Sequence, residues 1–263
     1  MTHTCTFPLW FKSFLINSGV KAHHTLIVHS AIRELSRLGI RAQNICDVLK
    51  NEVIPSGNLL MPTMTWRTVT PKSPIFNSNL TPSHTGALTE YFRKNIAQAR
   101  SLHPTHSVAG TGPDAKWLLN SHDKIGTPCS KYSPYGLITD SELLSNTFVL
   151  LIQVGLESCT FIHHFEELVD LDIYLKPEIE AEKFQIITSE QHKKFSLRAH
   201  NKRTRDFHQF GPALFQQGAL FIKHYHGITF TLIKAENIAN TLTKAFNQSQ
   251  YATLASFSYL RSV

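Results

Sequence analysis

Short runs of apolar residues alternate with helix-periodic segments along most of this chain. Residues 25–29 (TLIVH), 58–61 (NLLM) and 147–154 (TFVLLIQV) are apolar on both faces and too short for helices, which is typical of strands covered on both sides. The segments between them, such as residues 42–53, repeat apolar side chains with a helical period. This alternation predicts a three-layer α/β/α fold with a largely parallel central sheet.

The composition fits one globular domain. Hydrophobic residues make up 42% of the 263 residues and charged residues 17%, so the chain can bury a large core and disorder is excluded as its main state. We predict a single domain over residues 1–263, in which residues 171–263 complete the sheet. No apolar run is long enough to span a bilayer, so no membrane association is expected. Lys12 interrupts the apolar N-terminal segment, which favours an amphipathic surface helix over a targeting peptide.

Basic residues outnumber acidic ones and are unevenly placed. Lys and Arg total 26 against 19 Asp and Glu, a net charge of +7. Acidic residues concentrate in residues 157–182, whereas residues 55–135 and 183–205 are basic. A positive surface favours phosphate-bearing partners, but the chain carries no recognised nucleic-acid-binding motif, so no nucleic acid partner is expected. The four cysteines form no C-x-x-C pair, which indicates reduced thiols and a cytoplasmic location.

Two irregular stretches interrupt the regular pattern. Residues 65–85 are rich in Pro, Ser, Thr and Asn and lack a period, and residues 121–133 are also irregular. We predict long loops there. Long loops in compact domains are commonly functional, so the first of them is expected to border a cleft.

The strongest candidate for catalysis follows the apolar run at residues 147–154. Thr160, His163 and Glu166 recur every three residues at the start of a predicted helix, so their side chains share one face. In α/β sheets, sites gather at the carboxyl ends of strands. A carboxylate beside an imidazole orients the ring and raises its basicity, which makes a general base that works near pH 7. The alternative is a solvated helix start whose histidine and acid meet by chance.

A second polar cluster occupies residues 100–107 (RSLHPTHS), at a predicted helix-to-strand junction. In a chain with 15 histidines, such a cluster can reflect surface polarity alone. A zinc site is a further alternative, with ligands drawn from His103, His106, His163, His164 and Glu166. No recognised zinc-ligand, P-loop or nucleophilic-cysteine motif is present, so neither a metal nor covalent catalysis is expected.

Four blocks of the sequence, in order, resemble the aminoglycoside 3-N-acetyltransferase family, also called the antibiotic N-acetyltransferases. Residues 28–31 (VHSA) are similar to its V-H-S-S block, and residues 55–63 (PSGNLLMPT) to G-P-x-G-T-L-V-M-P-T. Residues 100–108 (RSLHPTHSV) are similar to R-S-x-H-P-x-x-S-x, and residues 149–166 to V-L-L-L-G-V-G followed by T-x-x-H-x-x-E. The resemblance is clearest up to about residue 170.

The sequence also departs from the family pattern. Cys159 stands where the family usually has Asn, and Leu156 where it usually has His. Some members use a further acidic residue in the last third of the chain. Its counterpart here could be His200, Asn201 or Asp206.

The resemblance implies an acetyl-CoA-dependent N-acetyltransferase with an α/β/α fold. The family's base corresponds to His163, with Glu166 as its partner, and it would deprotonate the acceptor amine for direct attack on the thioester. The blocks on the CoA side of the site contain Ser30, Thr63, His106 and Ser107. Contacts with the acceptor are expected from Thr160, Glu167 and Asp170, with residues 171–263 completing the acceptor side. The chemistry implies no metal.

The acceptor stays open between an aminoglycoside and another small amine, such as an amino sugar. The acidic residues 157–182 could hold a polycation, whereas the basic residues 55–135 favour an acceptor with fewer positive charges. A different class of function is a non-catalytic relative that binds CoA or another protein. Cys159 and Leu156 would support that alternative, whereas the intact His163–Glu166 pair opposes it. A homodimer is compatible with the sequence.

Overall fold

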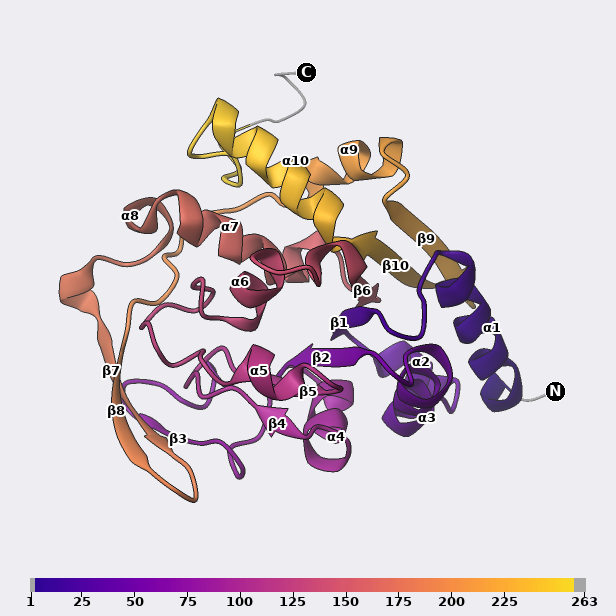
Figure 1. Ribbon diagram of the computed structural model, residues 1–263, viewed down its shortest axis with the longest axis horizontal. Coiled ribbons are helices and arrows are strands. Elements are labelled where there is room, and N and C mark those ends of the chain that lie inside the picture. The colour runs from indigo at the N-terminus through magenta and orange to yellow at the C-terminus, as the bar shows by residue number, and fades with distance from the viewer. Residues whose placement is uncertain (1–2, 258–263) are drawn as a thin grey trace.

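Strand β1 (Thr25–Ser30) lies in the middle of the central sheet of the protein, in a computed structural model that describes residues 3–257 (Figure 1). Leu26 and Val28 pack into the core on one side of the sheet and Ile27 into the core on the other, and all three are fully buried. Successive strand side chains point to opposite faces. The run is apolar at every position because helices cover both faces.

The central sheet has seven strands. Their spatial order is β4 (Ala99–Arg100), β5 (Val108–Thr111), β2 (Asn58–Pro62), β1, β6 (Thr147–Ile152), β10 (Ile228–Lys234) and β9 (Leu220–Tyr225). The predicted three-layer α/β fold is confirmed, but the sheet is mixed rather than largely parallel. In this sheet β2, β1 and β6 run parallel to one another, and all pairings on both flanks are antiparallel. An uninterrupted apolar strand indicates that both of its faces are covered. It does not indicate whether the neighbouring strands run parallel or antiparallel to it.

Helices form a layer on each face of this sheet. One layer packs into the core that contains Leu26 and Val28, and it consists of α1 (His3–Asn17), α2 (Arg33–Arg37), α3 (Ala42–Asp47), the π-helical turn η1 (Val48–Val53) and α4 (Ala87–Asn95). The other packs into the core that contains Ile27, and it consists of α5 (Ala115–Leu119), α6 (Pro134–Thr139), α7 (Phe161–Val169), α9 (Gly211–Gln216) and α10 (Ala235–Gln248). The remaining short helices are η2 (Leu144–Asn146), η3 (Leu156–Ser158), α8 (Leu171–Tyr174), η4 (Glu178–Glu180) and η5 (His208–Phe210).

The N-terminal helix α1 is confirmed, and one of its faces joins the core. Phe7, Phe11 and Leu15 recur every four residues and are fully buried, and the Phe11 ring lies 5.4 Å from that of Phe230 on β10. Within residues 3–257, no helix has the length and apolar composition needed to cross a membrane. The cytoplasmic location and the homodimer stay predictions.

A small three-stranded sheet lies beside the main body, at the left in Figure 1. It consists of β3 (Ile75–Asn77), β7 (Glu182–Ile187) and β8 (His192–Leu197). The segment predicted as a loop over residues 65–85 therefore contains a strand, because β3 pairs in parallel with β7 from the last third of the chain. The sequence does not predict strand β8, because its apolar residues, Phe195 and Leu197, are too few to reveal a strand pattern.

The apolar and β-branched residues within 221–232 favour a single strand, but these residues belong to the hairpin of β9 and β10. His226 and Gly227 make the turn, with φ angles of 48° and 79°. Two residues with positive φ form the tight turn whose twist matches a hairpin. Residues 223–227 (KHYHG) interrupt the apolar pattern at the turn, so the single-strand prediction overlooked a break that the sequence contains.

Candidate active site

A cleft of about 330 Å³ opens at the carboxyl ends of β1, β2 and β6. Strands β1 and β6 are parallel neighbours, so the segments that follow them lie side by side. The side chains that line the cleft and matter below are His29, Ser30, His106, Glu157, Thr160 and His163. The cleft thus gathers separate parts of the sequence.

His163 and Glu166 meet on helix α7 as their spacing predicts. The Nδ1 atom of His163 lies 2.7 Å from Oε2 of Glu166. The imidazole is 20% exposed, whereas the carboxylate is completely buried. Because Glu166 takes Nδ1, the other ring nitrogen, Nε2, is the one available to the cleft.

Two residues far along the chain hold the Glu166 carboxylate. Nε of Arg205 donates to both carboxylate oxygens at 3.0 Å, and the hydroxyl of Thr253 donates to Oε1 at 2.6 Å. Burial alone would raise the pKa of Glu166, but the contacts with His163, Arg205 and Thr253 together lower this pKa to about 2. Glu166 is therefore ionised at neutral pH and accepts the hydrogen bond from Nδ1 of His163, which makes Nε2 the nitrogen that can exchange a proton in the cleft.

The ring of His163 lies between two other rings. The His200 imidazole faces it at a centroid distance of 4.5 Å and an angle of 31°. The Phe207 ring meets it edge-on at 5.1 Å. With Glu166 holding Nδ1, these contacts fix both the position and the plane of the imidazole.

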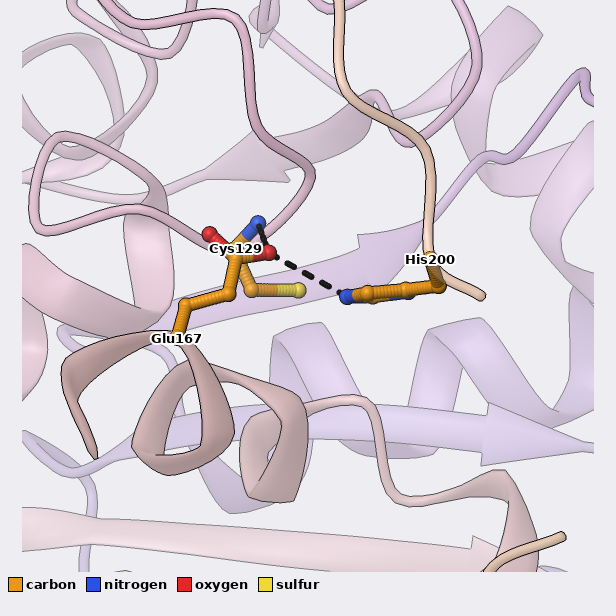
Figure 2. Close-up of side chains that lie close together, drawn as sticks. All are labelled: Cys129, Glu167 and His200. Atoms are coloured by element: carbon orange, nitrogen blue, oxygen red, sulfur yellow. Dashed lines mark hydrogen bonds and ion pairs between the residues drawn. The ribbon is translucent and has the colours of Figure 1, made fainter. Parts of the chain in front are cut away.

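Cys129 and Glu167, both buried, and the partly exposed His200 form a cluster behind His163, here called the rear cluster (Figure 2). Their ligand atoms all lie within 4.8 Å of one another, close enough to share a metal ion. The metal alternative drawn from the sequence used His103, His106, His163, His164 and Glu166 instead. Among residues 3–257, the rear cluster is the group that meets this distance test.

The cysteines do not suit nucleophilic catalysis. Cys129 and Cys159 are fully buried free thiols. Burial raises the pKa of Cys159 to about 12 and that of Cys129 well above its ordinary value, so both stay protonated near pH 7. The side chain of Cys5 lies outside the part of the chain that is described.

Of the residues expected on the CoA side, two line the cleft and two lie beneath it. Ser30 and His106 are in the lining, and the Ser30 hydroxyl is buried without a hydrogen-bond partner among the described residues. Thr63 and Ser107 are fully buried and absent from the lining. Nε of Arg100 donates to their hydroxyls at 3.2 Å and 3.0 Å, so their observed contacts hold the base of the cleft together.

Of the residues expected to contact the acceptor, only Thr160 lines the cleft. Glu167 is buried in the rear cluster, with a side chain that is 2% exposed. Asp170 caps helix α8, where its carboxylate accepts from the backbone N–H of Asp172 at 2.8 Å. The carboxylate that does line the cleft is Glu157, which pairs with His208 at 2.7 Å.

The sequence analysis did not identify the residues that hold the Glu166 carboxylate, the partner of His163. Arg205 lies in a basic stretch that gave no reason to single it out, and Thr253 lies in no motif. Of the candidates for a further site residue, His200 contacts the His163 ring. The side chain of Asn201 donates to the carbonyl of Ile173, and that of Asp206 accepts from the backbone of Gln209.

Residues 27–247 match the family described as aminoglycoside 3-N-acetyltransferase. The chain belongs to this family. The match extends past the blocks recognised in the sequence and takes in β9, β10 and most of α10. It also contains His163, Glu166 and Arg205.

Two curated members of the aminoglycoside 3-N-acetyltransferase family are similar to the chain over part of their length. The prophage-derived aminoglycoside N(3′)-acetyltransferase-like protein YokD of Bacillus subtilis (strain 168) is 25% identical over 186 residues, which is 62% of this chain and 66% of the relative. Aminoglycoside N(3)-acetyltransferase IV of a Salmonella species is 29% identical over 149 residues, 57% of this chain and 54% of the relative. These matches span less than two thirds of either relative.

Solved structures of this kind share the fold over almost the whole chain. The crystal structure of YokD has a TM-score of 0.74 at 21% identity and covers 92% of this chain and 99% of that one. AAC-IIIb in a binary complex with CoASH has a TM-score of 0.74 at 17% identity, with coverages of 92% and 96%. A mutant of AAC(3)-IVa in complex with a gentamicin has a TM-score of 0.76 at 20% identity, with coverages of 94% and 90%.

Proposed function

We propose that this protein is an acetyl-CoA-dependent N-acetyltransferase in which His163 is the general base. The observation that carries the proposal is the arrangement of His163 on α7. Its Nδ1 is held by an ionised, buried Glu166 and its ring lines the cleft. Membership in the aminoglycoside 3-N-acetyltransferase family supports the reaction class.

The proposed step needs a proton acceptor at Nε2 of His163. Amines are protonated near pH 7 and cannot attack until they lose a proton. Nε2 takes that proton, and the amine nitrogen attacks the acetyl carbonyl carbon. The C–N bond forms, the C–S bond breaks, and the CoA sulfur leaves as a thiolate that takes up the proton from His163. The attacking nitrogen then loses its second proton to Nε2, which passes it to water, so that a neutral amide and a neutral imidazole result. Glu166 stabilises the imidazolium that exists between the two transfers.

The cleft can accommodate a thioester with a phosphate-bearing tail. Ser30 and His29 carry buried polar atoms, Oγ and Nε2, without partners among residues 3–257. Both residues line the cleft, so a bound thioester could satisfy them. At the rim, the Arg67 guanidinium lies 5.0 Å over the Trp66 ring, where it could meet a phosphate. CoA bound to the structural neighbour AAC-IIIb agrees with this use of the fold.

The charges around the cleft favour an acceptor with few positive charges. A polycation needs several carboxylates, whereas the described lining contains one, Glu157. Of the other acids of residues 157–182, Glu166 and Glu167 are buried, Asp170 caps α8 and Asp172 pairs with Arg198. We therefore expect an amino sugar or similar small amine to be a better acceptor than an aminoglycoside. The gentamicin complex of AAC(3)-IVa supports the aminoglycoside alternative.

Thiol release from acetyl-CoA in the presence of an amine panel tests the function. We expect release with amines that carry one positive charge and weaker release with aminoglycosides. If thiol release is strongest with aminoglycosides, the transferase proposal stands, but the expectation of an acceptor with few positive charges is wrong. If acetyl-CoA binds in calorimetry but no amine causes release, the non-catalytic alternative replaces the proposal.

Removal of metal ions is expected to leave kcat unchanged, because the proposed chemistry uses an imidazole and not a Lewis acid. The measurement is kcat before and after dialysis against a strong chelator. The rear cluster is where a metal would bind, so Cys129→Ser is the matched variant. A loss of activity that Zn²⁺ restores in the wild type, but not in Cys129→Ser, would contradict the prediction.

A further inference from the structure

The rear cluster combines three kinds of metal ligand from three separate parts of the chain. Cys129 lies in the irregular residues 121–133, Glu167 on α7, and His200 in the segment after β8. The sulfur, a carboxylate oxygen and a ring nitrogen all lie within 4.8 Å of one another. Figure 2 shows the Glu167 carboxyl group and the His200 ring pointing toward one another, with the Cys129 side chain beside them. The three donor groups therefore face the same small space.

The separations of the donor atoms are close to those of a tetrahedral zinc site. With bonds of about 2.3 Å to sulfur and about 2.0–2.2 Å to nitrogen and oxygen, neighbouring ligand atoms lie roughly 3.3–3.7 Å apart. Nε2 of His200 and Oε1 of Glu167 are 3.2 Å apart. Because no pair exceeds 4.8 Å, a side-chain movement of roughly 1 Å closes the site.

The donor atoms have few competing partners. Oε2 of Glu167 has no hydrogen-bond partner among the described residues, and the Cys129 sulfur lies 3.9 Å from the carbonyl oxygen of Thr160, which is a weak contact. Burying a carboxylate is costly unless a cation or hydrogen bonds satisfy it. The nearby guanidinium of Arg205 is occupied by Glu166. A metal bound through both oxygens of Glu167, the sulfur and the imidazole would have four ligand atoms.

Backbone contacts hold the ligand-bearing segments together independently of these side-chain donors. The N–H of Arg198, directly after β8, donates to the carbonyl of Gly126 at 2.8 Å, so the segments of His200 and Cys129 run side by side. The N–H of Cys129 donates to Oε1 of Glu167 at 2.7 Å. The site is thus largely formed before a metal binds.

We propose that the rear cluster binds one structural Zn²⁺ ion through Cys129, Glu167 and His200. A thiolate and a carboxylate balance the two charges of the ion, and the thiol proton passes to solvent on binding. A thiolate with an imidazole selects zinc over Mg²⁺ and Ca²⁺, which prefer oxygen ligands alone. The His200 side chain is 14% exposed and gives the ion a route of entry.

The proposed ion joins an irregular segment, a helix and the end of the small sheet. None of its three ligands lines the described cleft, so it stabilises the fold and takes no part in the proposed proton transfer. The inference does not rest on the proposed function, and kcat is still expected to need no metal.

Zinc titration of the full-length protein, after treatment with a chelator and its removal, tests the site directly. Calorimetry should give one tightly bound Zn²⁺ per chain. Cys129→Ser should weaken binding by more than about 100-fold, because even residues that only orient a ligand contribute 10–100-fold. Cys159→Ser is the matched control, since Cys159 is a second fully buried thiol of the same core, and it should bind as the wild type does. Equal affinity in Cys129→Ser would assign the zinc to other histidines and overturn the proposal.

Cobalt substitution tests the ligands in the wild type, without a variant that could fail to fold. Co²⁺ added to the metal-free protein should give a near-ultraviolet charge-transfer band from the thiolate and the visible spectrum of a tetrahedral ion. Zn²⁺ should abolish both by displacement. A cobalt complex without the thiolate band would exclude Cys129 as a ligand and overturn the site.

Thermal unfolding tests the structural role. At a free Zn²⁺ concentration of 100 times the dissociation constant, Tm should rise by about 5–10 °C. Glu167→Gln should lose this rise, whereas Glu180→Gln, on the exposed turn η4, should keep it. A Tm indifferent to Zn²⁺ in the wild type would overturn the proposal. These measurements use no substrate, so their outcome is separate from that of the transferase assay.

Discussion

Replacing His163 with alanine is expected to lower kcat by about 10²–10⁴-fold, which is the usual contribution of a positioned general base. Nε2 of His163 is the nitrogen available to the cleft, and Glu166 holds the opposite one. Without this imidazole, the acceptor amine must lose its proton to water. The measurement is thiol release at saturating concentrations of both substrates, with acetyl-CoA affinity measured separately by calorimetry.

The variant should bind acetyl-CoA as the wild type does, because the substitution removes the general base and not the residues expected to contact CoA. His192→Ala is the matched control: His192 lies on β8 with an exposed side chain bonded to Gln185, and its loss should leave kcat unchanged. Near-normal turnover of His163→Ala in a folded protein would remove this residue from the mechanism.

Replacing Arg205 with alanine is expected to reduce the free energy of unfolding by about 3–5 kcal/mol, the usual cost of removing one partner of a buried ion pair. Glu166 is completely buried, and the Arg205 guanidinium meets both of its oxygens. The same guanidinium donates to the backbone carbonyls of Asn201, Arg203 and Tyr174. The variant leaves a charged carboxylate in the core with His163 and Thr253 as its partners. Chemical denaturation at pH 7 measures the loss.

The pH dependence identifies the carboxylate as the cause. The pKa of Glu166 falls from an ordinary 4.5 to about 2 in the folded protein, so its ionic contacts add stability that is complete above about pH 4.5 and is lost as the pH falls toward 2. The deficit of Arg205→Ala should therefore shrink as the solution is acidified over that range. Arg203→Ala, with an exposed side chain two residues away, is the control and should unfold like the wild type. A deficit that is the same at pH 7 and pH 3 would assign the loss to the backbone contacts.

Local sequence was sufficient for the elements that carry the base. The apolar runs of β1, β2 and β6 mark strands covered on both sides, and a three-residue spacing on a helix brings His163 and Glu166 onto one face whatever surrounds it. The carboxyl ends of parallel strands then place this helix start beside Ser30. These features depend on residues that are near each other in the chain, so their pattern is visible without a structure.

The rest of the site depends on contacts between distant segments. Arg205 and Thr253 are 39 and 87 residues from Glu166, and His200 is 33 residues from Glu167. Periodicity carries no information about such pairs, because it describes which face of an element is buried and not what covers it. The antiparallel direction of the flanking strands also depends on contacts between distant segments. So does the burial of Glu167, which keeps its carboxylate out of the acceptor's reach. The residue pattern is thus enough to predict the layers of the fold and the His163–Glu166 pair. Which charges surround that pair follows only from the folded arrangement, because the cost of burying a charge depends on every segment packed against it.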